Sequence, residues 1–136
     1  PNTIEDMYFS FSNCTNLRAV NIVNGNEYYE SIDGIVYSKP KYYDFGGAKI
    51  EFVPPAIETA VIADGVKEIS DFSFAHCKKL KTITIPESVR KIGDCAFRDC
   101  ENLSRVKFGG SKYQWELIKI SNKKKGNQYL IDAAKE

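Results

Sequence analysis

Apolar residues recur along this chain at a regular spacing of about 23 residues, while the polar residues between them change freely. The segment FSFAHCKKLKTITIP at 72–86 is followed by CAFRDCENLSRVKF at 95–108, so that Phe74 aligns with Phe97 and Leu80 with Leu103. A further copy, FSNCTNLRAVNI, lies near the start of the chain. A period in the range of roughly 20 to 50 residues is the sequence signature of a repeat array.

Each copy contains the pattern Leu-x-x-Ile-x-Ile, whose last part alternates apolar and polar residues like a strand with one buried face. The pattern predicts strands near 20–22, 60–62, 82–85 and 105–108. A single unit of the repeat cannot bury its own apolar face, but a neighbour stacked on it can. We therefore predict a right-handed stacked solenoid with a parallel ladder of short strands.

The spacing breaks between the first copy and the next, at about residues 24–55. Two alternating stretches, SIDGIVYS and KIEFVPP, flank a segment with Pro40 and Gly46-Gly47, which are strong turn signals. We expect an inserted β-hairpin with strands at about 33–38 and 48–53. After Pro54-Pro55 the solenoid pattern resumes.

The last part of the chain, about 109–136, departs from the repeat and indicates a C-terminal cap. Tyr113, Leu117 and Ile120 follow helical spacing, and Asn127 is a helix start signal. A helical segment with Trp115 would cover the unpaired edge of the last coil. The run Lys123-Lys124-Lys125 is expected to be a solvated loop, with a binding patch as the minor alternative.

Composition and charge exclude several function classes. With 19 basic and 18 acidic residues the net charge is +1, so no overall field attracts nucleic acid. No apolar run approaches the roughly 20 residues needed to span a bilayer, so we expect no transmembrane segment in this chain.

The candidate reactive groups have structural explanations. Cys14, Cys77 and Cys100 occupy one equivalent position of the repeat, where free thiols pack like small hydrophobic groups. We expect them to be reduced and buried, and we leave the exposure of Cys95 open. His76 precedes Cys77, yet a repeat-core position is expected to hold a structural cysteine and not a nucleophile. We expect no catalytic residues, no cofactor and no metal site.

The segment IPESVRKIGDCAFRDCENLSRVKF resembles the BspA-type leucine-rich repeat, I-P-x-x-V-x-x-I-G-x-x-A-F-x-x-C-x-x-L-x-x-I-x-I. The inserted segment and the tail are similar to a hairpin and a closing segment of that family, so the resemblance covers nearly the whole chain. It implies an α/β repeat fold: a right-handed leucine-rich-repeat solenoid of about 23-residue units, with an inserted β-hairpin and a helical C-terminal cap, as one domain over 1–136.

The first copy departs from this pattern, because DMYFSF stands where KIGDCAF stands later. Either that coil is irregular or the chain is a fragment of a longer solenoid with further coils before Pro1. We expect the latter.

The resemblance implies a bacterial surface or secreted protein without enzymatic activity. Its expected role is a binding or adhesion module for an extracellular protein or glycan whose identity the residues do not specify. The alternative is a structural spacer that displays another domain. An enzyme, such as a glycan-directed one, is the third and least favoured hypothesis, because no cluster of polar groups marks an active site.

The outward positions of the strand pattern define the expected partner-binding surface. Stacked coils would align them as one polar sheet that becomes basic toward its C-terminal end, bordered by aromatic residues of the hairpin. Ordinary solvated strand residues are the equally weighted alternative. The candidate residues are Asn21, Thr59, Val61, Thr82, Thr84, Arg105, Lys107, Tyr37, Tyr42 and Tyr43.

Overall fold

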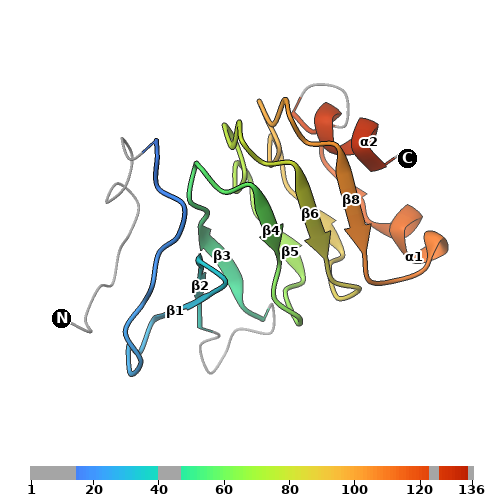
Figure 1. The fold of residues 1–136 in the computed structure, drawn as a ribbon. Coiled ribbons are helices and arrows are strands. Elements are labelled where there is room, and N and C mark those ends of the chain that lie inside the picture. The colour runs from blue at the N-terminus through green and yellow to red at the C-terminus, as the bar shows by residue number, and fades with distance from the viewer. Residues whose placement is uncertain (1–14, 40–46, 123–125, 135–136) are drawn as a thin grey trace.

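The computed structural model describes residues 15–39, 47–122 and 126–134. Over these residues the chain forms a repeat, solenoid-like fold of successive coils with two rows of short strands (Figure 1). One row faces the viewer and the second lies behind it. Two short helices lie at the C-terminal end.

The first row is a parallel ladder with the strand order β4-β6-β8. Thr59 pairs with Thr82, and Thr82 with Arg105, so each partner lies one repeat further along the chain. Parallel strands at 82–85 and 105–108 are confirmed, and the strand expected at 60–62 begins one residue earlier. The strands are β4 (Thr59–Val61), β6 (Thr82–Ile85) and β8 (Arg105–Phe108).

The second row is a parallel ladder of two-residue strands, in the order β5-β7-β9. It forms where each coil turns back after its first strand, and the sequence pattern did not reveal it as strand. The strands are β5 (Glu68–Ile69), β7 (Lys91–Ile92) and β9 (Lys119–Ile120).

The core contains the inward side chains of both ladders and of the loops that connect them. Each repeated apolar residue meets its counterpart in the next coil: the rings of Phe74 and Phe97 stack with centroids 5.1 Å apart and an interplanar angle of 4°. The fully buried members include Phe74, Phe97, Ile69, Leu80, Ile83, Ile85 and Ile92.

An antiparallel three-stranded sheet, in the order β1-β2-β3, precedes the ladders. Its second and third strands fall where the sequence predicts strands, whereas the first strand was not predicted. The strands are β1 (Tyr29–Ile32), β2 (Ile35–Ser38) and β3 (Lys49–Phe52).

The prediction of a strand at 20–22 is wrong, because this segment forms hydrogen bonds to β1 and to the β1–β2 turn and is no strand of the parallel ladder. The Val20 N–H donates to the Gly34 carbonyl at 3.0 Å, and the Ile22 N–H donates to Ser31 Oγ at 2.8 Å. The approach requires glycine, since a Cβ at Gly34 would lie 2.9 Å from the Ala19 Cβ. These bonds occupy donors that a ladder strand would use.

Two short helices, α1 (Lys112–Leu117) and α2 (Gln128–Ala134), follow the last ladder strand. Ser111 begins α1 with a capping box, in which its hydroxyl accepts from the Gln114 N–H and the Gln114 side chain accepts from the Ser111 N–H. The Trp115 ring meets Phe108 of β8 edge-on, with centroids 5.4 Å apart.

The cysteine prediction is confirmed for the two column members that the structure describes. Cys77 and Cys100 are buried free thiols, and the Cys100 thiol donates to the Phe74 carbonyl at 3.0 Å. Burial raises the pKa of each of these two thiols to about 12. Cys95 is half-buried and free, and Cys14 lies outside the described residues.

Replacing Leu80 by alanine should cost about 2–5 kcal/mol of unfolding free energy, because the fully buried side chain leaves a cavity between coils. Thr82→Ala, two residues away on the outer face of β6, is the matched control and should cost no more than about 0.5–1 kcal/mol. Urea denaturation of both variants measures the difference, and equal losses would contradict the assigned inner and outer faces.

The buried thiols should react slowly with alkylating reagents in the native protein. With a pKa near 12, only about one thiol in ten thousand is ionised at pH 8. Because the unfolded thiols have an ordinary pKa near 9, this burial also favours the folded state below pH 9, and the benefit is lost as pH rises toward 12. Peptide mapping after brief labelling should find Cys77 and Cys100 unmodified at pH 8 and modified in urea. Rapid native labelling of both, or a disulfide between them, would overturn the assignment.

Candidate binding surface

The outer face of the β4-β6-β8 ladder is built by strand alternation. Ala60 and Ile83 point into the core, so their neighbours in each strand point outward. Parallel pairing aligns these outward residues into two rows across the coils. One row is Thr59, Thr82 and Arg105, and the other is Val61, Thr84 and Lys107.

These six predicted residues are therefore brought together on one face. Thr59, Val61, Arg105 and Lys107 are exposed, whereas Thr82 and Thr84 in the middle strand are half-buried. Asn21 is exposed but does not join the face, because its segment forms no strand of the ladder.

Tyr37 is the clearest correction to the predicted surface. It is fully buried in β2, and its hydroxyl accepts a hydrogen bond from the Ala63 N–H at 3.0 Å. Burial, the main cause, raises the pKa of this hydroxyl. Tyr37 therefore joins the hairpin to the repeat core and offers no ring to a partner. Tyr42 and Tyr43 lie outside the described residues.

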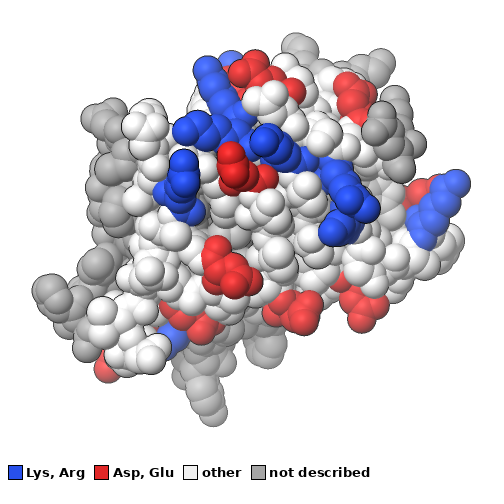
Figure 2. All heavy atoms as spheres, in the orientation of Figure 1, with Lys and Arg blue, Asp and Glu red and all other residues white. Residues whose placement is uncertain are grey.

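Basic side chains form a band across this side of the molecule. Figure 2 shows lysine and arginine side chains crossing the upper part of the face toward β8, with acidic side chains among them and others below the band. Among the described residues, neither Arg105 nor Lys107 forms an ion pair; the pairs present are Lys91–Glu68 and His76–Asp99. The two cations of β8 are thus available to an external anionic group.

The side chains of this face are three hydroxyls, one aliphatic group, one guanidinium and one amine, and no carboxylate, imidazole or thiol is among these six residues. The His76–Cys77 pair does not form a nucleophile site, since the imidazole is exposed and its Nδ1 lies 2.8 Å from Asp99 Oδ2 while the thiol is buried. Within the described ranges, no group of three or more His, Cys, Asp or Glu side chains is placed to hold a metal ion.

A hollow beside β8 is a further concave feature, and sequence reasoning missed it. It has a volume of about 200 Å³ and is lined mainly by the inward side of β8 and by α1. We predicted that Trp115 belongs to a helical segment packed over the last coil, but the sequence does not indicate a hollow beneath that segment.

None of the helices in the part of the chain that the structure describes is long and apolar enough to cross a membrane.

Comparison with known proteins places the chain among leucine-rich repeat proteins. The pneumococcal vaccine antigen PcpA has a similar crystal structure, with 28% identity and a TM-score of 0.54, over 66% of this chain and 21% of PcpA. A leucine-rich repeat protein from Bacteroides capillosus is 24% identical with a TM-score of 0.50, over 60% of this chain and 66% of that protein, which shows the fold alone. This chain therefore spans about a fifth of the length of PcpA. None of the curated proteins is detectably similar to it.

A family model described as BspA type leucine rich repeat region (6 copies) matches residues 51–122, more than half of the chain. This range begins in β3 and ends after β9, so it includes both parallel ladders. Proteins of this family are often surface proteins and are generally non-enzymatic. The chain belongs to the BspA type leucine-rich repeat family.

Proposed function

We propose that this protein is a non-enzymatic binding or adhesion module, secreted or displayed on a bacterial surface, that recognises an extracellular protein or glycan. The observation that carries the proposal is the outer face of the β4-β6-β8 ladder, with hydroxyl groups on two strands and the cations Arg105 and Lys107 on the third. Family membership supports a binding role.

The repeat organisation fits this role. In our proposal, right-handed units of about 23 residues form one domain, with the inserted hairpin at about 24–55 and the helical cap at about 109–136. The constant inward residues fix the spacing of the coils, so that the outward residues are free to suit a partner. Stacked coils present such residues as an extended surface.

The second candidate function is a structural spacer that displays another domain. The neutral hydroxyl-bearing strands β4 and β6 are compatible with a solvated face that binds nothing. Binding of a defined macromolecule to this chain separates the two functions, since a spacer has no affinity of its own.

Reversing the charge at the end of the face should weaken partner binding. We expect Arg105→Glu with Lys107→Glu to reduce affinity at least tenfold for a protein or glycan captured from a panel of extracellular matrix components, because two favourable ionic contacts become repulsive. Surface plasmon resonance measures the affinity, and thermal melting should show little change because both side chains are exposed.

The matched control reverses two charges beside the other ladder. Lys67→Glu with Lys119→Glu makes the same change in net charge at two exposed lysines that form no ion pair among the described residues, and should leave binding intact. Tyr42→Ala with Tyr43→Ala tests the proposed aromatic border. Normal binding by both the β8 variant and the tyrosine variant would place the contact surface elsewhere, and a chain that binds no panel member would favour the spacer.

A further inference from the structure

Strand β8 ends the first ladder within the described residues and leaves one side without a partner strand. Arg105 donates its N–H to the Lys81 carbonyl at 3.1 Å, and Gly109 donates to the Ile85 carbonyl at 2.9 Å. Backbone groups alternate sides along a strand, so the N–H and C=O groups of Val106 and Phe108 point away from β6. An extended chain can pair with such an edge.

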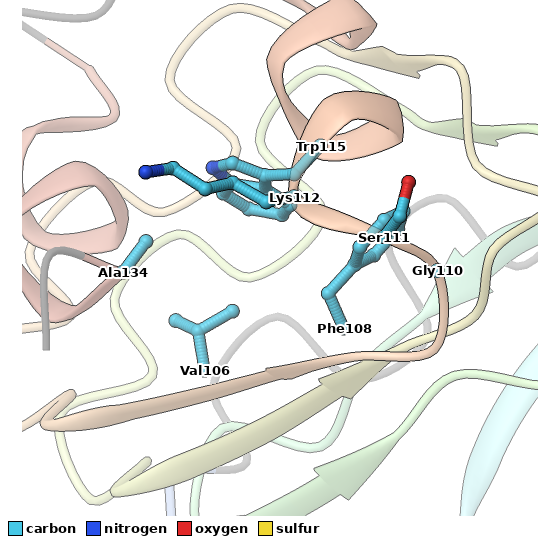
Figure 3. A pocket seen from close by; sticks show the side chains of 7 residues that line it. All are labelled: Val106, Phe108, Gly110, Ser111, Lys112, Trp115 and Ala134. Atoms are coloured by element: carbon cyan, nitrogen blue, oxygen red, sulfur yellow. The ribbon is translucent and has the colours of Figure 1, made fainter.

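The hollow lies next to this free edge. Figure 3 shows the side chains of Val106 and Phe108 rising from β8 on one side, with Lys112 and Trp115 from α1 and Ala134 from α2 around the rest. Val106 and Phe108 point inward from β8 but remain only half-buried, since no further coil lies against them. The free edge and the unfilled apolar space therefore belong to the same strand.

Charge surrounds this apolar space. Arg105 and Lys107 project from the outer face of β8, and Lys112 lies at the rim of the hollow. All three are exposed, and none forms an ion pair among the described residues. The edge thus combines open backbone groups, an apolar hollow and three uncompensated cations.

These charges determine which kind of strand can occupy the edge. A second copy pairing edge to edge across a two-fold axis would bring Arg105 and Lys107 against their own counterparts, and like charges on neighbouring strands destabilise pairing. Lysine on an edge strand is a known device against such self-association. An acidic strand would instead be attracted to this edge, because its carboxylates would lie beside the cations.

We propose that the free edge of β8 binds an extended acidic segment of another protein by strand addition. Residues of an added strand alternate between the two faces, as those of β8 do. Its outward residues would be Glu or Asp beside Arg105 and Lys107, and its inward residues would be large and apolar, filling the hollow against Trp115. This site uses the edge of the ladder, whereas the proposed function uses its face, so either can hold without the other.

The probe is the peptide acetyl-Gly-Glu-Leu-Glu-Phe-Glu-Gly-amide. Trp115 is the only tryptophan of the chain, so its fluorescence reports directly on the hollow. We expect a saturable change in Trp115 emission with the wild-type protein, and at least tenfold weaker binding of the same peptide with Lys in place of Glu. Absence of a saturable change with the acidic peptide, or equal binding of the two peptides, would overturn the proposal.

Backbone pairing is tested with two N-methylated peptides, one modified at the Glu residues and one at Leu and Phe. One of the two should bind at least tenfold more weakly than the parent: the Glu-methylated peptide if the added strand is parallel, the other if it is antiparallel. Undiminished binding of both peptides would rule out strand addition and leave only a charge contact. This test uses the wild-type protein, so it does not depend on the folding of any variant.

Two protein variants complete the test. Val106→Pro removes an edge N–H without removing a bond to β6, and should weaken peptide binding at least tenfold; Thr82→Ala, on the neighbouring strand, is its control. Arg105→Glu with Lys107→Glu should reverse the preference, so that the lysine peptide binds better. Concentration-dependent dimers of the wild-type protein that Val106→Pro abolishes would show that a second copy occupies the edge and would overturn the proposal.

Discussion

The fold depends on one constraint. A coil of this chain cannot provide hydrogen-bond partners for all of its own backbone N–H and C=O groups, nor can it cover its own apolar side chains, so each coil depends on the next. The loop segment at 72–76 shows this directly. Three backbone N–H groups of this segment donate to backbone carbonyls of the following coil at 2.7–3.1 Å: Phe72 to Asp94, Phe74 to Ala96 and His76 to Arg98. The bonds coincide with the stacked phenylalanine rings and the buried thiols, so hydrogen bonding and apolar burial require the same register.

The same constraint applies to the last described coil, whose polar backbone groups find a partner in the tail. Asn127, fully buried, accepts the Phe97 N–H at 3.1 Å through its side-chain carbonyl and donates to the Gly93 and Ser121 carbonyls at 3.0 and 2.6 Å. In the preceding coil the equivalent donor, Phe74 N–H, bonds to a backbone carbonyl. One side chain therefore substitutes for a missing stretch of backbone. Strand β9 extends the second ladder in the same way, but the first ladder stops at β8.

Sequence reasoning succeeded where a residue's environment repeats. Leu80 and Ile83 align with Leu103 and Val106 one repeat later, so their spacing alone predicted their burial and the strand that contains Ile83. Sequence reasoning failed to predict burial where a segment packs against a part of the chain that does not repeat. Strand β2 is the middle of its sheet, and one of its faces joins the main core while the other packs Val36 against Val20 and Tyr29. Consecutive buried residues hide the alternation, and Tyr37 could not be assigned to the core from its neighbours.

The candidate surface was predictable to the same extent. Alternation in β6 and β8 assigned Thr82 and Lys107 to one face, because parallel pairing at a constant offset preserves the face of every residue. Asn21 was assigned to it on the assumption that the first copy also forms a ladder strand, and that assumption failed because bonds to the hairpin use its backbone donors.

Inward and outward residues of this fold are under different constraints. Because inward residues must match those of the neighbouring coil, a change there disturbs two interfaces at once, whereas an outward residue is in contact with solvent and can differ between coils. The change from Thr82 and Thr84 to Arg105 and Lys107 within one register shows how far the outer face can differ between adjacent coils while the core beneath stays apolar. Cations are also compatible with the end of a ladder, since they oppose self-pairing of an open edge. The strand that the stacking constraint leaves without a neighbour among the described residues is therefore also the one whose outer face carries two cations.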